Sequence, residues 1–402
     1  MSLVQTSLIN GYKPKQLPVL LKGQQMSEFN LSEEQKEFQK LARDFSVREL
    51  APKAAHFDES GAYPLDVLAK AFEAGLTNVM APEQAAGLAL PFFEAALIQE
   101  ELAVGCSGIG GFVEASAIAI LPLIAEGNGD KVKKFIQPLM EKTAFAGFSE
   151  SMLDTISGEG QLPVLTKSGS QFEISGRVRV VAGDHCPWFV LKAKENAGQE
   201  SIFIVDKNSD SVKQIAQVNR LGRKCLGTVD LELNAVKLEA DHLVGTAGGA
   251  SEVMSFVLPR AYLLFAASAI GICRAALTHS IAYAKERKTF GRPIGDHQAV
   301  AFMMSDMAKE IQAAQLLTYK GCQLADQGEN DFASALQAKV FAQEAAMRIA
   351  VDAVQIFGGY GYSREYPVEK LMRDAKTYQI TGGTSQKQLA EIGRQALAQA
   401  LR

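Results

Sequence analysis

The sequence predicts an α+β fold in three successive parts: an N-terminal helical domain, a small middle domain with an antiparallel β-sheet or barrel, and a C-terminal helical bundle. In the first and last thirds of the 402-residue chain, apolar residues recur at helical spacing. In the middle third, short β-rich runs are separated by Gly, Asn and Asp. Helices do not alternate with these runs, so a parallel doubly wound sheet is not expected.

The first part begins after a variable arm. Ser32 followed by Gln35 predicts a capping box at the start of the first helix. A later helix is expected from Phe92 to Val104, and the glycine-rich segment 105–111 is expected to interrupt it. The expected boundaries are 1–28 for the arm, 29–144 for the helical domain, 145–247 for the β-domain and 248–402 for the bundle.

The middle and last parts differ in their apolar period. The expected strands cover residues 172–175, 178–181, 189–192, 202–205 and 229–238. The bundle is expected to be a four-helix bundle over 261–285, 298–324, 331–356 and 367–378. Its first helix is Ala-rich and apolar on much of its circumference, which is typical of a buried central helix. Ser385 is expected to cap a last helix, with Gln388 in the capping-box position.

The composition excludes several classes of function. Lysines and arginines number 41 and acidic residues 45, a difference of −4, so no basic excess suggests nucleic acid. The five cysteines and five histidines are scattered without metal-ligand spacing, which indicates no metal site and a reducing compartment. The first 25 residues lack signal-peptide character, and no uninterrupted apolar run reaches transmembrane length. A cytoplasmic protein without membrane insertion is expected.

Familiar catalytic motifs are missing from the sequence. It has no G-x-G-x-x-G between strand and helix, no G-x-x-x-x-G-K-[ST] and no H-E-x-x-H. The segment from Gly147 to Ser151 resembles a G-x-S-x-G elbow but lacks its closing glycine. A serine hydrolase is therefore not favoured.

Two C-terminal segments have residue patterns that suit the binding of a phosphate-containing ligand. The first is R-K-T-F-G-R-P-I from Arg287, followed by Gln298. The second, from Gln355 to Gln386, holds two glycine clusters, each beside a helix. A guanidinium suits a phosphate, and glycines beside a helix N-terminus let the backbone approach an anion closely. The alternative is structural, because basic residues and a glycine are also typical of a helix C-terminus.

Together the two segments resemble the C-terminal signatures of the acyl-CoA dehydrogenase family of flavoproteins, R-x-x-F-G-x-P-I-x-x-x-Q and Q-x-F-G-G-x-G-Y-x-x-x-Y-P-x-E-x-x-x-R-D-A. The resemblance implies FAD, an acyl-CoA or acyl-carrier thioester substrate, an electron-transfer flavoprotein as acceptor, and a role in fatty acid metabolism. It also implies a homodimer or homotetramer that shares FAD between subunits. The implied cofactor-binding residues are Arg287, Phe290 and Gln298 on a neighbour's FAD, Gln355, Gly358 and Gly359 on the adenine-dinucleotide half, and Thr384 and Gln386 nearby.

The middle domain departs from the family pattern. The usual T-E-P-x-x-G-S-D reads S-E-S-M-L-D-T-I from Ser149. Ser149 keeps a hydroxyl where the flavin ring is usually bonded, and Thr155 keeps one where acyl-CoA is usually touched. The usual W-I-T-N-G reads V-V-A-G-D from Val180 to Asp184, so the tryptophan that covers the flavin and the threonine that bonds it are replaced.

The catalytic base is the larger departure. The glutamate that removes the α-proton in the family corresponds to Gly382, and the alternative position on the central helix is Pro259. The Gly382 N–H is still able to polarise the thioester carbonyl. Arg260 is either a contact for CoA or a solvated helix arginine. The carboxylates to examine as substitutes are Asp154, Asp184 and Glu365, each with a structural role as the alternative.

Three hypotheses follow from this pattern. The first is an FAD-dependent α,β-desaturation of an acyl thioester with an unidentified or relocated base. The second is a non-oxidative flavoprotein of the same fold, such as a sulfinyl-acyl-CoA desulfinase. The third is a catalytically silent thioester-binding or partner subunit. Gly382→Glu is expected to install flavin bleaching if the pocket still seats an acyl chain.

Overall fold

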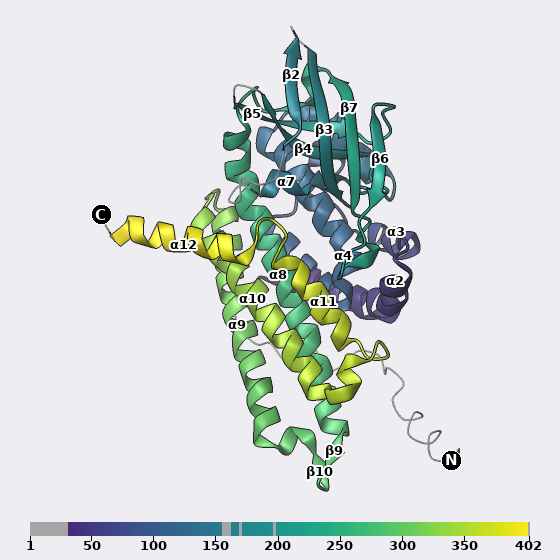
Figure 1. The fold of residues 1–402 in the computed structure, drawn as a ribbon, viewed down its shortest axis with the longest axis vertical. Helices are drawn as coiled ribbons and strands as arrows, with labels where there is room; N and C mark the ends of the chain where they lie inside the picture. Colours follow the sequence, from purple (N-terminus) through teal and green to yellow (C-terminus); the bar gives the residue numbers. More distant parts are fainter. Residues whose placement is uncertain (1–30, 155–161, 169–170, 196–197, 401–402) are drawn as a thin grey trace.

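The computed structural model describes residues 31–154, 162–168, 171–195 and 198–400, so the expected arm 1–28 lies outside it. The described chain has the predicted three-part α+β architecture. In Figure 1 the sheet lies at one end, the long helices α4 (Phe92–Glu126) and α8 (Ala250–Glu286) run through the middle, and the bundle forms the other end. The domain boundaries given above stay predictions.

The N-terminal part is helical, as expected. Its first helix starts with the predicted capping box: Ser32 Oγ accepts from the Gln35 N–H, and Gln35 Oε1 accepts from the Ser32 N–H. The principal helices before α4 are α1 (Glu33–Phe45), α2 (Ala54–Ser60) and α3 (Leu65–Glu73).

The interruption expected at residues 105–111 is confirmed by a break at Cys106, where φ is −165° and ψ is 110°. Beyond this break the helical path of α4 resumes and continues to Glu126. The glycines also serve close packing, because a Cβ at Gly111 would lie 2.3 Å from the Arg223 guanidinium. The same glycine-rich pattern therefore marks a contact between the helical part and the β-domain.

The β-domain is a mixed sheet in the order β6-β7-β3-β1-β4-β5-β8. The predicted antiparallel pairing holds for most neighbours, but β1 runs parallel to β4, and β2 pairs with β4 in parallel as well. Edge strand β6 was not predicted; its exposed side chains give no apolar alternation. The strands are β1 (Gly147–Ser149), β2 (Val164–Ser168), β3 (Gln171–Val181), β4 (Trp188–Glu195), β5 (Glu200–Asp206), β6 (Val212–Gln217), β7 (Val229–Leu238) and β8 (Leu243–Val244).

A tryptophan fastens this sheet to the helical part. Trp188, at the start of β4, is 6% exposed, and its indole N–H donates to the Phe135 carbonyl at 2.9 Å. The two rings also pack edge to face, with centroids 6.1 Å apart. The N–H of a buried indole requires such an acceptor, so the bond fixes where the sheet lies against the helices.

The C-terminal part packs around α8, as predicted. By length and composition, α4 and α8 could each cross a membrane, but 89% and 94% of their most apolar windows are buried within the protein. They are core helices here. A small hairpin, β9 (Lys288–Thr289) with β10 (Arg292–Pro293), closes the far end of the bundle (Figure 1). The remaining helices are α9 (Gln298–Asp326), α10 (Phe332–Phe357), α11 (Val368–Tyr378) and α12 (Ser385–Ala400).

The capping box expected at the last helix is replaced by a longer-range contact. Ser385 begins α12, but the side-chain amide of Gln388 bonds to groups outside this helix. Gln388 Nε2 donates to the Gly382 carbonyl at 2.9 Å, and its Oε1 accepts from Lys339 Nζ at 3.0 Å. The α11–α12 loop is thereby tied to α10.

Candidate functional site

Both sequence signatures contribute to one hollow at the far end of the bundle. Arg287 follows α8, and Gly358 and Gly359 follow α10; all three line a cavity of about 430 Å³. Its other lining residues are Tyr283, Thr289, Ile294, Ile356, Phe357 and Tyr360. The cavity combines an exposed guanidinium with aromatic surface, which suits a ligand with both phosphate and a flat ring.

The glycines leave this cavity open. Gly358 adopts φ 59° and ψ −137°, a backbone region that is essentially restricted to glycine. A Cβ at Gly358 or Gly359 would meet nothing within 4 Å. The backbone thus borders free space beside Arg287. This arrangement fits the adenine-dinucleotide half of FAD.

The remaining residues of these signatures are also exposed. Gln355 lies in the last turn of α10, and Gln298 is the first residue of α9. Phe290 stands at the tip of the β9–β10 hairpin, 97% exposed and with a φ of +51°. An aromatic side chain held out in a left-handed backbone conformation is uncommon in a folded protein.

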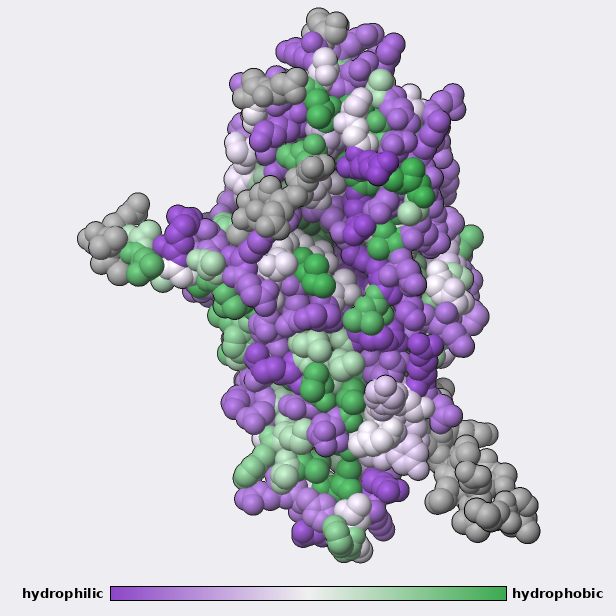
Figure 2. Space-filling model, viewed as in Figure 1, coloured by the Kyte–Doolittle hydropathy of each residue, from purple (hydrophilic) through white to green (hydrophobic). Residues whose placement is uncertain are grey.

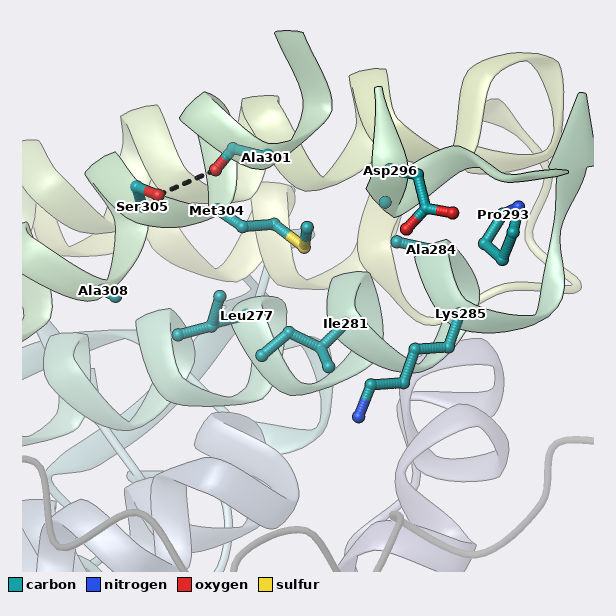
Figure 3. A pocket seen from close by; sticks show the side chains of 11 residues that line it. Leu277, Ile281, Ala284, Lys285, Pro293, Asp296, Ala301, Met304, Ser305 and Ala308 are labelled. Atoms are coloured by element: carbon teal, nitrogen blue, oxygen red, sulfur yellow. Dashed lines mark hydrogen bonds between the residues drawn. The ribbon is translucent and has the colours of Figure 1, made fainter. Parts of the chain in front are cut away.

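A second hollow of about 540 Å³ lies between α8 and α9. Figure 3 shows Leu277, Ile281 and Met304 facing its interior, with Lys285 and Asp296 nearby. None of the predicted site residues lines it. Within the described ranges, no group of three or more His, Cys, Asp or Glu side chains is arranged to hold a metal ion.

The second part of the site is the α11–α12 loop. Gly382 and Gly383 have φ values of +71° and +101°. The Gly382 carbonyl accepts from the Tyr262 hydroxyl at 3.0 Å and from Gln388 Nε2 at 2.9 Å. The loop is therefore held rigidly from both α8 and α12.

A side chain at residue 382 would be tightly packed. A Cβ there would lie 3.2 Å from Tyr262 Cε1 and 3.3 Å from Phe265 Cε2, closer than ordinary packing. Tyr262 is 0% exposed and Phe265 is 1% exposed. Any side chain at residue 382 would therefore press on these two rings.

Lys339 on α10 was missed by the sequence reasoning. It is 1% exposed, and its Nζ donates to Gln343 Oε1 at 2.8 Å and to Gln388 Oε1 at 3.0 Å. Burial lowers the pKa of Lys339 to about 7. A lysine inside the apolar run A-L-Q-A-K-V-F-A was the signal available in the sequence.

This lysine predicts a pH dependence of stability. The pKa of Lys339 falls from 10.5 in the free side chain to about 7 in the fold, so the unfolded chain binds the extra proton between these values. Stability therefore rises with pH from about 7 to 10.5. Between pH 7 and 9.5, the wild type is expected to gain roughly 2–3 kcal/mol relative to Lys339→Met in urea unfolding. Lys376→Met, which removes an exposed lysine, should follow the wild type. Parallel profiles for wild type and Lys339→Met would contradict the assignment.

The β-domain side of the site is closely packed. Ser149 is fully buried, and its hydroxyl lies 2.9 Å from that of Ser151. Val180 and Ala182, which stand in the altered W-I-T-N-G segment, are also buried. Thr155 and Ile156 lie outside the described residues. Thr384 and Gln386 belong to the α11–α12 loop and the first turn of α12, half-buried and exposed respectively.

Arg260 is engaged inside the bundle. Its guanidinium donates to the carbonyls of Phe256 and Ala325 and to Asn330 Oδ1, at 2.7–3.0 Å. The side chain is 4% exposed, and burial lowers its pKa to about 10. It therefore ties α8 to the α9–α10 connection, and a role on CoA stays a prediction.

The three candidate carboxylates lie in different places. Asp154 Oδ1 is 3.5 Å from where a Cβ of Gly383 would stand, so its carboxylate meets the loop. Asp184 accepts from Gln214 Nε2 at 3.4 Å within the β-domain. Glu365 is exposed in the segment between α10 and α11.

A buried ion network crosses the centre of the molecule and was also not predicted. Arg223, in a left-handed conformation with φ of +53°, donates through Nη2 to Glu114 Oε1 at 2.7 Å. The other Glu114 oxygen accepts from Tyr378 and from Ser268. The Arg223 backbone N–H donates to Asp374 at 2.6 Å. Arg223 and Glu114 side chains are each 2% exposed.

Comparisons with known proteins agree with these features. The acyl-CoA dehydrogenase N-terminal domain matches residues 32–143, and the acyl-CoA dehydrogenase C-terminal domain matches residues 247–397. A probable medium-chain specific acyl-CoA dehydrogenase 2, mitochondrial, from Caenorhabditis briggsae is 33% identical over 387 residues, covering 94% of each chain.

Solved structures show the same similarity. Butyryl-CoA dehydrogenase from Megasphaera elsdenii is 30% identical with a TM-score of 0.86, covering 92% of this chain and all of that one. A chain solved in work on the electron transferring flavoprotein of Acidaminococcus fermentans gives the same identity, TM-score and coverage.

Proposed function

The chain belongs to the acyl-CoA dehydrogenase family of FAD-binding oxidoreductases, and from this we propose that it oxidises an acyl thioester between its α- and β-carbons. The observation that carries the proposal is the open cavity beside Arg287 and the two glycines, where the family signatures meet. When bound, FAD would supply the acceptor for a hydride from the β-carbon. Anaerobic mixing of the purified yellow protein with a panel of acyl-CoAs should bleach the flavin.

The chain's own residues would hold the cofactor at two places. Arg287, Gly358 and Gly359 suit the pyrophosphate and adenine half of an FAD that is shared with a neighbouring subunit, with Gln298 and Gln355 at the same end of the bundle. Ser149, Thr384 and Gln386 are proposed for the flavin half. The Gly382 N–H would polarise the thioester carbonyl, as an oxyanion-type donor.

Arg287→Ala is expected to weaken FAD binding about 10- to 100-fold, because a charge-assisted hydrogen bond to phosphate contributes roughly 1.5–3 kcal/mol. Retained FAD is measured by absorbance after dialysis against increasing salt. The thermal stability of the FAD-free protein should not change, since the side chain is exposed. Lys285→Ala is the matched control, because Lys285 is an exposed cation two residues away that lines the other hollow. Equal FAD retention by both variants would contradict the assigned role.

A homodimer or homotetramer is proposed from the surface. Phe290 protrudes 97% exposed at the hairpin, and α12 projects from the body in Figure 1. Figure 2 shows apolar side chains gathered on the helical half of the visible face. Exposed apolar residues on α9, α10 and α12 include Phe302, Leu316, Val351 and Leu397. Such side chains are typical of a surface that is covered by another subunit. Light scattering on the eluting protein would give the mass of the assembly.

We also propose an electron acceptor and a cellular location for the protein. An electron-transfer flavoprotein is proposed as the acceptor, in keeping with the similarity to a chain from the Acidaminococcus fermentans work. A cytoplasmic location is proposed because all five cysteines are free and buried. CoA and carrier-protein thioesters would be distinguished by comparing both in the bleaching assay.

One observation favours a second function. Because a side chain at residue 382 would press on Tyr262 and Phe265, a reaction that needs no base at this position would leave this packing unchanged. A non-oxidative elimination, such as sulfite release from a sulfinyl acyl-CoA, meets that condition. Sulfite production without flavin bleaching would support it. A colourless protein that resists reconstitution with FAD would instead support a silent thioester-binding or partner subunit.

A further inference from the structure

Two of the five cysteines meet where helix α4 is broken. Cys106 lies at the break, and Cys225 lies in the short 3₁₀-helix Lys224–Leu226 that precedes β7. The Sγ atoms of Cys225 and Cys106 lie 3.0 and 3.7 Å from one point, the Cβ position of Gly108. The Cys225 thiol also donates a hydrogen bond to the Cys106 sulfur. Two sulfur atoms from distant parts of the sequence are therefore held side by side.

A buried ion pair lies beside these two thiols. Lys370 Nζ on α11 is 2.5 Å from Asp374 Oδ2, and the two side chains are 10% and 0% exposed. The hydrogen bond from Cys225 lowers the pKa of the Cys106 thiol, and the charge of Lys370 lowers it further, against the opposing effect of burial. The same hydrogen bond and burial raise the pKa of Cys225. Cys106 is thus favoured as the thiolate, the reactive form of cysteine, while Cys225 keeps its proton.

The other three cysteines lie in different surroundings. Cys186, Cys273 and Cys322 are at most 4% exposed, and burial raises the pKa of each thiol. Cys186 donates to the Gly183 carbonyl at 3.6 Å. A buried thiol of this kind behaves as a small apolar side chain. Contact between two thiols, next to a cation, is what distinguishes Cys106 and Cys225.

We propose that Cys106 and Cys225 are a redox-active dithiol, which a hydroperoxide oxidises to a disulfide and a dithiol reductant restores. The Cys106 thiolate attacks one peroxide oxygen, the O–O bond breaks, and the hydroxide that leaves takes up a proton to become water. Cys106 is then a sulfenic acid. The Cys225 sulfur attacks the Cys106 sulfur, the S–S bond forms, and the sulfenic oxygen leaves with the Cys225 proton as a second water. The two electrons that the sulfurs lose have reduced the peroxide.

The size of the oxidant follows from the burial of the pair. Each of the two side chains is 3% exposed. Hydrogen peroxide is close to water in size, so it is the hydroperoxide that we expect to reach the Cys106 sulfur, whereas bulky thiol reagents are excluded from the folded protein.

Hydrogen bonds already hold the two chain segments together. Ser107, which follows Cys106, donates through its hydroxyl to Asp374 Oδ2 at 2.9 Å. The backbone N–H of Arg223, two residues before Cys225, donates to Asp374 Oδ1 at 2.6 Å. One carboxylate therefore anchors both segments before any oxidation. The disulfide would make this contact between α4 and the β-domain covalent.

The test treats the folded full-length protein with hydrogen peroxide at neutral pH. The remaining thiols are then alkylated in denaturant, and the peptides are mapped by mass spectrometry. The expected product is a peptide pair joined through Cys106 and Cys225, which a dithiol reductant separates again. Oxidation of Cys106 is expected to be about 10-fold or more faster than that of Cys186, because only the thiolate reacts.

Two variants and a stability measurement accompany the mapping. Cys225→Ser should stop at the sulfenic acid of Cys106, which dimedone captures. Cys322→Ser, which changes a buried thiol outside the pair, should form the disulfide as the wild type does. Because a crosslink restrains the unfolded chain, the oxidised wild type should unfold at a higher guanidinium chloride concentration than the reduced protein. Cys225→Ser should show no such shift.

Three results would overturn the proposal. They are recovery of all five cysteines as thiols after peroxide treatment, a main disulfide that involves any other cysteine, and a lower unfolding midpoint of the disulfide-linked protein. Mapping of the wild type decides the matter even if Cys225→Ser does not fold. Flavin bleaching by acyl-CoA is measured separately, so the proposed function stands or falls independently of this dithiol.

Discussion

Gly382→Glu is expected to destabilise the protein by roughly 2–4 kcal/mol and to bleach the flavin with acyl-CoA no faster than the wild type does. The backbone at Gly382 has a φ of +71°, a region that costs a non-glycine residue about 1–2 kcal/mol. The new Cβ would also press on Tyr262 and Phe265 at 3.2 and 3.3 Å. Overpacking of this kind typically costs ~1–3 kcal/mol. The expectation based on sequence alone, that this variant installs bleaching, was conditional on a pocket that still seats an acyl chain.

Further variants distinguish the cost of backbone strain at residue 382 from the cost of overpacking by its side chain. Urea unfolding of Gly382→Ala measures the cost of the backbone and Cβ alone. Adding Phe265→Ala to Gly382→Glu opens room for the longer side chain, although a new carboxylate there would also lie close to Lys339, whose Cε is 3.7 Å from the Cβ position. An ion pair with that lysine would draw the carboxylate away from the substrate. Full stability of the single Gly382→Glu variant, with bleaching faster than that of the wild type, would show that the aromatic rings move aside easily.

Arg223→Met is expected to cost ~3–5 kcal/mol of stability, because it leaves Glu114 charged and buried without its cation. Both side chains are 2% exposed, so water cannot replace the lost partner. The remaining donors to Glu114, Tyr378 and Ser268, are neutral hydroxyls. Guanidinium chloride unfolding gives the change in free energy.

The double variant Arg223→Met with Glu114→Leu should recover most of the loss, since an apolar pair of similar volume often replaces a buried ion pair at little cost. The solvent-accessible pair Arg348 and Glu310, whose side chains are 52% and 24% exposed, is the matched control, because surface ion pairs contribute only ~0–1 kcal/mol. Arg348→Met should therefore change stability by less than about 1 kcal/mol. A small effect of Arg223→Met, similar to that control, would mean that the centre of the molecule relaxes around the unpaired carboxylate.

The three-part fold was predictable because its periodicities are strong. Helices α8, α9 and α10 each exceed 25 residues, so their apolar pattern outweighs local exceptions. The glycine-rich stretch in α4 correctly predicted a break in the helix, which lies at Cys106. Its second role, the close contact of Gly111 with Arg223, could not be predicted because Arg223 lies in the β-domain, far along the chain.

The candidate site was only partly predictable from the sequence. Arg287, Gly358 and Gly359 could be placed from short signatures, and they do line one cavity. The loss of space at Gly382 could not be foreseen, because the Tyr262 ring that fills it lies 120 residues earlier in the chain. Lys339 was missed because a single lysine on a helix is normally solvent-exposed.

Trp188 gives the protein a built-in optical probe. It is the single tryptophan of the chain, and its hydrogen bond to Phe135 joins the β-domain to the helices. Indole emission shifts to the red when the ring enters water, so any event that parts the two domains becomes visible without a label. Movement of the β-domain on cofactor or thioester binding can therefore be timed directly in a stopped-flow fluorimeter, with Trp188→Phe as the silent reference.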